Sequence, residues 1–239
     1  MYAATLDVRP LTFEVAGFWR RNMLMRDRQT GSIWQQATGE AVAGPLRGRQ
    51  LEVLGGAHST WAAWRREHPL TVVAVEPAHA PRGLAGLLPF TWIWNWSGRI
   101  PWTPPGLAAT DTRLPPHEEV AGLSIAGEAR AYPLSVLRRR RVVNDELGGV
   151  PLAIVYEPHG DRMRAFDGRI GGVAVTLASG DDVLTDLSGT MRWSHHGEPV
   201  GSAAGERLRS LPIRRQFWLA WSEFHPGTTV YADPIGHGS

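Results

Sequence analysis

Four side chains in the second half of the sequence have the chemistry and spacing of metal ligands. Glu157 and His159 flank Pro158, and residues two apart on a strand lie on the same face. His195 and His196 are adjacent, so on a strand they point to opposite faces and only one can join the other two, unless the pair lies in a turn. Imidazoles with a carboxylate are a known metal grouping. The four side chains are therefore candidate ligands for one divalent metal ion, and solvated loop histidines are the reading that we favour.

The composition removes several other kinds of chemistry. The 239-residue chain has no cysteine, and all 25 of its basic residues are arginine. Disulfides, thiolate metal sites, a cysteine nucleophile, a Schiff-base lysine and a P-loop lysine are therefore excluded. The sequence also lacks a Gly-rich phosphate loop, a G-x-S-x-G elbow and an H-E-x-x-H motif. What remains is a folded protein whose reaction, if it has one, the motifs do not name.

Charge and the first residues bear on partners and location. The net charge of +2 is no signature of nucleic-acid binding, so no nucleic-acid partner is expected. Residues 1–10 lack the basic and apolar regions of a signal peptide. As written, the chain is expected to be cytoplasmic, although an upstream segment could be missing.

Two stretches of the sequence share polar, glycine and aromatic residues in the same order, which indicates an internal duplication. The second stretch carries His195-His196 near the position where the first has Gln35-Gln36. We predict a first, N-terminally incomplete repeat over residues 1–77, a Pro/Gly/Trp-rich linker or insert over 78–116, and a more complete second repeat over 117–239. The shared residues are Asp27, Gly31, Trp34, Gly39, Glu40, Trp61, Trp64, His68 and Pro69 in the first repeat, and Asp186, Gly189, Trp193, Gly197, Glu198, Trp218, Trp221, His225 and Pro226 in the second.

Some of the shared polar residues have ordinary structural explanations. His68 and His225 each precede a proline at the expected end of a helix, where an imidazole can bond the last carbonyl groups. Asp27 and Asp186 lie beside turn glycines, where a carboxylate usually accepts backbone N–H bonds. We therefore predict structural roles for all four residues.

Short β-rich segments bounded by turn residues predict a mainly β, β-rich α+β fold. Two related β units are expected, each closed by a short helix that bears two tryptophans. The i, i+3 spacing places the two tryptophans of each helix on one face, which predicts that they face the interior. A third short helix is expected at Tyr132 to Arg139. The clearest strands are expected at 11–15, 71–75, 151–156 and 228–231.

The stretch between the repeats is rich in tryptophan. Its uncharged part, Gly83 to Gly98, is interrupted by Pro89 and is shorter than the ~20 residues needed to span a bilayer, so no membrane span is expected. Trp92, Trp94 and Trp96 could make an interfacial membrane contact, or they could cover a core or a neighbouring domain.

Residues 118–158 carry a series of motifs in a recognisable order. Gly127-Glu128-Ala129-Arg130-Ala131-Tyr132-Pro133-Leu134 is followed by Val142-Val143-Asn144-Asp145 and then by Gly148-Gly149-Val150-Pro151. This pattern resembles the prokaryotic family called domain of unknown function 3179 (DUF3179). The first repeat is similar to the second half of that family's sequence. The resemblance implies that the first repeat lacks its first half, which a partner chain, as in a homo-oligomer, could supply. The family's activity is not established, so the resemblance implies no reaction.

Two departures from the family pattern concern the candidate site. The family's Cys-Pro-x-Cys element is replaced by Glu157-Pro158-His159-Gly160, and a histidine before Val142 is replaced by arginine within Arg138 to Arg141. The arginine run could bind phosphate or an anionic partner, or it could be a solvated face. We therefore expect a scaffold or a protein that binds a small ligand or a partner. The alternative is a mononuclear metal-dependent enzyme that uses Glu157, His159 and either His195 or His196.

Overall fold

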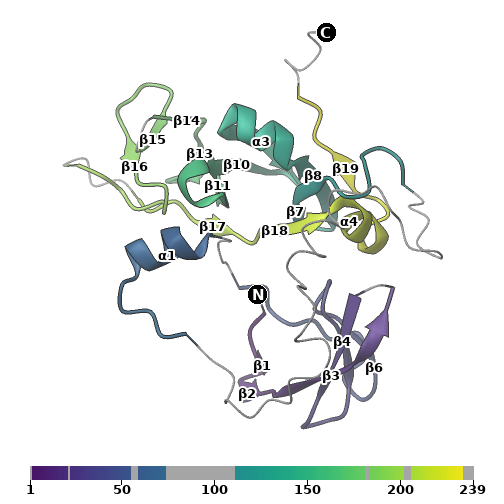
Figure 1. The fold of residues 1–239 in the computed structure, drawn as a ribbon. Helices are drawn as coiled ribbons and strands as arrows, with labels where there is room; N and C mark the ends of the chain where they lie inside the picture. Colours follow the sequence, from purple (N-terminus) through teal and green to yellow (C-terminus); the bar gives the residue numbers. More distant parts are fainter. Residues whose placement is uncertain are drawn as a thin grey trace, which may run out of the picture.

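The computed structural model describes residues 2–20, 22–54, 59–73, 111–180, 183–201 and 206–233. The fold is mainly β, as predicted, with short helices (Figure 1). Trp92, Trp94, Trp96 and most of the expected linker lie outside the described residues. None of the helices in the described part has the length and apolar character needed to cross a membrane.

The N-terminal unit (residues 2–54) contains a two-stranded and a four-stranded antiparallel sheet, each with its strands in sequential order. Trp34 and Leu51 are its buried centre, and Tyr2 packs against them. Asp27 is fully buried, and its Oδ1 accepts the Thr30 backbone N–H at 2.6 Å, which confirms the predicted turn role. The strands are β1 (Thr5–Leu6), β2 (Arg9–Pro10), β3 (Phe13–Trp19), β4 (Asn22–Asp27), β5 (Ile33–Gln35) and β6 (Ala41–Ala43).

The C-terminal unit (residues 111–233) is built around two four-stranded sheets. One sheet has the order β18-β7-β8-β19, and the other has the order β17-β11-β10-β9. The strands of the first are β7 (Glu119–Ile125), β8 (Glu128–Pro133), β18 (Arg214–Phe217) and β19 (Thr229–Val230). The strands of the second are β9 (Val142–Leu147), β10 (Val150–Glu157), β11 (Arg162–Asp167) and β17 (Ser210–Leu211).

Two smaller sheets and three short helices complete this unit. Helix α3 confirms the third predicted helix to within two residues at its start. Asp186 Oδ1 accepts the Met191 backbone N–H at 2.9 Å, as predicted for that turn. The elements are β12 (Arg169–Ile170), β13 (Val173–Ala174), β14 (Leu177–Ser179), β15 (Leu184–Asp186), β16 (Arg192–Trp193), α3 (Leu134–Arg140), the 3-10 helix η2 (Pro158–Gly160) and α4 (Trp218–Phe224).

Strand β10 explains where the main core lies. Its residues are apolar from Leu152 to Tyr156, and alternate side chains enter two different clusters. Leu152, Ile154 and Tyr156 pack with α3, β7 and β8 residues, whereas Ala153 and Val155 pack with the β14–β16 region. A strand covered on both faces needs a continuous apolar run, and this is the run that the sequence shows.

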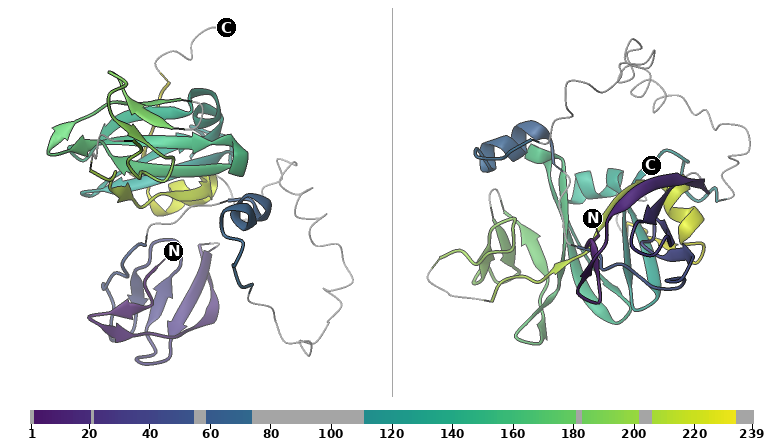
Figure 2. Two further views of the ribbon diagram at one scale, coloured as in Figure 1. Left: turned by 90° about the vertical axis from the view of Figure 1, so that its left-hand side faces the viewer. Right: turned by 90° about the horizontal axis from the view of Figure 1, so that it is seen from below.

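The two tryptophan-bearing helices have different environments, so the predicted burial holds only for α4. Trp218 and Trp221 of α4 are buried against β7 and β8. Trp61 and Trp64 of α1 (Trp61–Glu67) are 51% and 39% exposed, which corrects the prediction for the first helix. The reason is that α1 lies beside η2 in the C-terminal unit, away from the N-terminal sheet (Figures 1 and 2). The predicted strand at 71–75 is likewise absent from Thr71–Val73, the part of it that is described.

Candidate functional site

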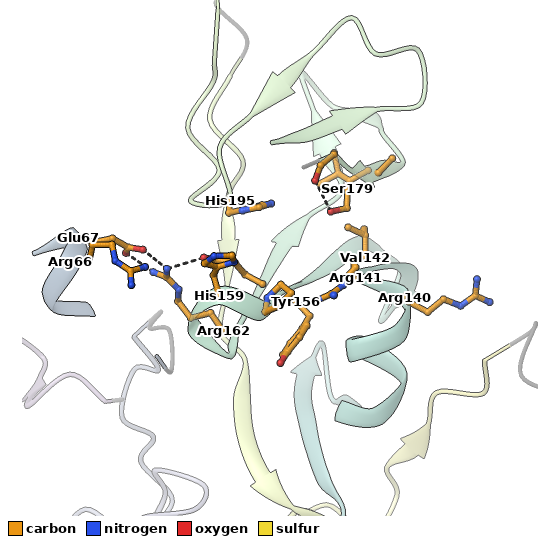
Figure 3. A pocket seen from close by; sticks show the side chains of 15 residues that line it. Arg66, Glu67, Arg140, Arg141, Val142, Tyr156, His159, Arg162, Ser179 and His195 are labelled. Carbon is orange, nitrogen blue, oxygen red and sulfur yellow. Dashed lines mark hydrogen bonds and ion pairs between the residues drawn. The ribbon is translucent and has the colours of Figure 1, made fainter. Parts of the chain in front are cut away.

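A cavity of about 810 Å³ lies beside η2, at the position of the Glu157-Pro158-His159-Gly160 element. Figure 3 shows its side chains: Arg66 and Glu67 reach it from α1, and Arg140, Arg141 and Val142 line the opposite side. The remaining walls come from β10, β11, β14 and the turn at His195. The cavity therefore lies between α1 and strands of the C-terminal unit, which are far apart in the sequence.

Three of the four predicted ligands line this cavity. Glu157, His159 and His195 lie on its wall, whereas His196 lines a neighbouring cavity of about 410 Å³ on the other side of Glu67 and Arg162. The two adjacent histidines diverge because they lie in a turn that follows β16. Within the described residues, no group of three or more histidine, aspartate and glutamate side chains is close enough to hold a metal ion. The metal site therefore stays a prediction.

Five charged or polar side chains form a closed ring between the two cavities, which we call the ion-pair ring. Arg162 donates to both carboxylate oxygens of Glu67 and, at 2.8 Å, to Glu157 Oε1. Arg164 Nη1 lies 3.5 Å from Glu157 Oε2, and its Nη2 lies 3.1 Å from His196 Nδ1. His196 Nε2 closes the ring 3.8 Å from Glu67 Oε2. The ring therefore ties α1 to β10 and β11.

Burial and neighbouring charges set the protonation states in this ring. The hydrogen bond from Arg162 lowers the pKa of Glu67, so this carboxylate is ionised at neutral pH. Burial, with Arg164 adding to it, lowers the pKa of His196, so its imidazole is neutral at pH 7. A neutral imidazole can accept a hydrogen bond from Arg164 at Nδ1 and carry its hydrogen on Nε2, toward Glu67. The ion-pair ring thus contains two guanidinium charges and two carboxylate charges, which balance.

This balance leaves Glu157 poorly placed to bind a cation. Its carboxylate is 15% exposed, and both of its oxygens face guanidinium groups. Arg162, at 4% exposed, cannot turn away into solvent. Two fixed positive charges oppose a metal ion at the same carboxylate. The electrostatics around Glu157 therefore favour an anion in the adjacent cavity over a cation.

The ion-pair ring is electrically balanced, and the excess positive charge of the cavity comes from arginines outside the ring. Within the described residues, neither Arg66 nor Arg141 has a carboxylate partner within 4.0 Å, whereas Arg140 forms an ion pair with Asp233. His159 and His195 add N–H donors to the same wall. The cavity therefore has an excess of positive charge and of hydrogen-bond donors.

Arg141 lies at this wall in an unfavourable backbone conformation, which two backbone hydrogen bonds hold in place. It follows α3 with a φ of 64°, where its N–H bonds Leu137 O and its C=O accepts from Tyr156 N at 2.7 Å. A non-glycine residue in the left-handed region costs about 1–2 kcal/mol. Such strain often marks a functional position. Its guanidinium lies 5.9 Å from the Tyr156 ring centroid, beside the cavity.

Sequence reasoning missed Arg66, Glu67 and Arg162 as site residues. A signal existed for the first two, because α4 has Glu223-Phe224 where α1 has Arg66-Glu67. The last residue is thus apolar in α4 and charged in α1, which indicates a different environment for the end of α1. No local pattern marks Arg162, because its partner Glu67 is distant in the sequence.

The fold and this site define a mainly β protein with a cationic cavity at the junction of its parts. The chain belongs to the DUF3179 family, proteins of unknown function, whose family model matches residues 1–229. This confirms the family resemblance that the motifs carried. No curated protein and no solved structure matches the chain.

Proposed function

We propose that the protein binds a small organic anion in the cavity beside η2. The observation that supports this most directly is the pair of arginines, Arg66 and Arg141, that line the cavity without a carboxylate partner among the described residues. Arginine guanidinium groups match carboxylate and phosphate geometry and remain charged at every ordinary pH. A small-ligand binding protein is therefore the function class that this site supports best.

The dimensions of the cavity are consistent with a ligand larger than a simple ion. Ligand cavities commonly have volumes of roughly 300–1,000 Å³, and this one has about 810 Å³. Arg66 and Arg141 lie on opposite sides of it (Figure 3). A ligand with two acidic groups, such as a di- or tricarboxylate, would contact both arginines and receive donors from His159 and His195 between them.

Isothermal titration calorimetry with citrate, and with glycerol as a neutral comparison, tests this proposal. Citrate should bind the purified full-length chain, and its affinity should fall as salt is raised, because salt screens exposed charges. The Arg66→Gln and Arg141→Gln variants should each bind at least about tenfold more weakly, the effect of losing ~1.4 kcal/mol. Glycerol should not bind.

The matched control is Arg47→Gln, which removes one exposed arginine from the N-terminal unit, away from the cavity. This variant has the same change in net charge, so it reports any nonspecific effect. Equal weakening by all three substitutions would show that citrate binds the overall charge of the protein. Unchanged affinity in the Arg66 and Arg141 variants would place the ligand elsewhere. Either result would contradict the proposal.

A further inference from the structure

Helix α1 and the residues that follow it have the same internal structure as α4 and its following residues. Trp64 Nε1 donates to Thr71 Oγ1 at 2.9 Å, and Trp221 Nε1 donates to Thr228 Oγ1 at 2.9 Å. In each case the histidine that ends the helix lies against the second tryptophan, with ring centroids 4.2 Å apart for Trp64 and 3.9 Å for Trp221. Residues 61–73 and 218–230 are thus two similar docking elements.

The second of these elements shows what such an element binds. Trp218 and Trp221 are buried against Val120 and Ala131 of the β7–β8 hairpin. Gly122 provides the space, because a Cβ at this position would lie 2.3 Å from the Trp221 ring. After the helix, β19 pairs in parallel with β8, with Thr229 opposite Arg130 and Val230 opposite Ala131. One hairpin therefore covers both the tryptophans and the following strand.

In the part of the chain that the structure describes, no such hairpin covers the first element. Trp61 is 51% exposed and Trp64 is 39% exposed, where Trp218 and Trp221 are 0% and 1% exposed. Val72 and Val73, which follow the helix as Thr229 and Val230 follow α4, are 92% and 55% exposed. Among the described residues, Thr71–Val73 pairs with no strand. We call the surface formed by Trp61, Trp64, Val72 and Val73 the α1 face.

One side of α1 already has a partner in the C-terminal unit. Ala63 is buried, and Glu67, four residues later on the same side, joins Arg162 in the ion-pair ring. Thr60 N also donates to Gly160 O at 3.1 Å. The helix is therefore anchored to the C-terminal unit, and Trp64 borders the same cavity of about 410 Å³ as Glu67 and Arg162.

We propose that the α1 face binds a β-hairpin supplied by a different protein. The described part of this chain contains two docking elements but one hairpin of the β7–β8 type. That hairpin is covered by α4 on one face and by the cluster that includes Leu134 and Leu137 of α3 on the other. A second copy of the chain brings no free hairpin of this type in its described residues, because its β7–β8 hairpin is covered in the same way. The occupant that we propose is therefore a hairpin of another polypeptide.

The β7–β8 hairpin defines the chemistry of this partner. It presents a glycine opposite the second tryptophan of the helix, with small apolar residues beside it as Val120 and Ala131 are. Its second strand has a free edge, so that Thr71–Val73 can add to it in parallel. Adding a strand to a free sheet edge gives main-chain hydrogen bonds, and the tryptophans give side-chain selectivity.

The test uses the full-length chain and a head-to-tail cyclised peptide with the sequence of residues 117–134 as the probe. Circular dichroism first establishes that the peptide is a hairpin, because an isolated two-stranded hairpin is only marginally stable. Calorimetry then measures its binding to the wild-type chain. Binding is expected, and a peptide with Gly122→Val should not bind, because its side chain occupies the space that a tryptophan ring needs.

Substitutions on the chain locate the binding surface. Trp64→Ala should weaken binding about 30-fold, the usual effect of removing an aromatic hot spot. Val72→Asp, at a position 92% exposed, should also weaken it and cannot act through the folded core. Val8→Ala changes a residue that is 96% exposed in the N-terminal unit, and it should have no effect.

Three outcomes would overturn the proposal. The first is a folded cyclic peptide that does not bind the wild-type chain. The second is equal binding to the wild-type, Trp64→Ala and Val72→Asp chains. The third is a wild-type dimer in sedimentation that Trp64→Ala dissociates, which would make a second copy the occupant of the α1 face.

Discussion

Glu67 of α1 and Arg162 of β11, 95 residues apart in the sequence, form a two-pronged ion pair that anchors the helix to the C-terminal unit. Arg162 is 4% exposed and Glu67 is 30% exposed. The pair separates two cavities, and Arg162 also neutralises Glu157. One guanidinium thus holds α1 in place and sets the charge of the candidate site.

Removing this guanidinium should strongly destabilise the protein. Arg162→Ala leaves Glu157, 15% exposed, without its closest cation, and breaking a buried ion pair in this way costs about 3–5 kcal/mol. Arg207→Ala removes the exposed pair with Glu198 and should cost less than about 1 kcal/mol. Urea unfolding followed by far-UV circular dichroism measures both. Similar losses in the two variants would contradict the role of the ion-pair ring.

The paired helices provide an internal comparison of two tryptophans. Trp221→Ala removes a ring that is 1% exposed and should cost about 3–5 kcal/mol of unfolding free energy. Trp64→Ala removes a ring that is 39% exposed, and we expect it to cost only about 60% as much, because the loss scales with buried area. The measurement is chemical unfolding of each variant. Equal costs would mean that the α1 face is covered in solution.

Arg141 should show a conflict between stability and binding. Arg141→Gly relieves the left-handed conformation, and we expect a gain of about 0.5–1 kcal/mol after allowance for the greater entropy of glycine in the unfolded chain. The same change should weaken citrate binding. Arg141→Gln is the control, because it removes the charge but keeps the strain. A destabilised Arg141→Gly protein would show that the guanidinium serves the fold.

His225 should make stability depend on pH. Burial, helped by the Arg214 guanidinium, lowers the pKa of His225 to about 4 from its ordinary value of 6.5. Between these values the unfolded chain binds a proton that the native chain does not, so acidification favours unfolding. We expect a loss on the order of 1–2 kcal/mol between pH 6.5 and pH 4, reduced from the full linkage value by partial solvent screening.

The variant His225→Gln isolates this contribution from that of the carboxylates. Its unfolding free energy, measured from pH 7 to pH 4.5, should fall less steeply than that of the wild type. Carboxylates with lowered pKa values, such as Asp27 and Asp167, affect both proteins equally. Parallel curves for the two proteins would rule out a neutral, buried His225.

The charge around Glu157 leads us to expect no stoichiometric divalent metal in the purified protein. Arg162 and Arg164 both face its carboxylate, and His196 Nδ1 lies 3.1 Å from an Arg164 nitrogen. Elemental analysis after dialysis without chelator measures this directly. One metal ion per chain, lost in the His159→Ala, His195→Ala double variant, would contradict this expectation and support the metal-dependent enzyme instead.

The sequence by itself determined what depends on local pattern. Short β-rich segments bounded by turn residues predicted a mainly β chain, and the motifs around Tyr132 and Asn144 indicated its family. Such features follow from backbone geometry and from residues that lie near each other in the chain. The spacing argument for Glu157 and His159 was wrong in its premise, because β10 ends at Glu157 and His159 lies in the 3-10 helix η2, although both residues line one cavity.

Tertiary structure alone decided which groups meet across long distances. Helices with the same tryptophan spacing have a buried Trp221 and an exposed Trp64, because burial depends on the surface that a helix meets. The turn after β16 placed His195 and His196 in different cavities. Glu67 reached Arg162 because α1 lies on the C-terminal unit, a placement that no spacing rule encodes. The charge of the site is therefore a property of the folded chain, since it depends on which arginines find carboxylates and which do not.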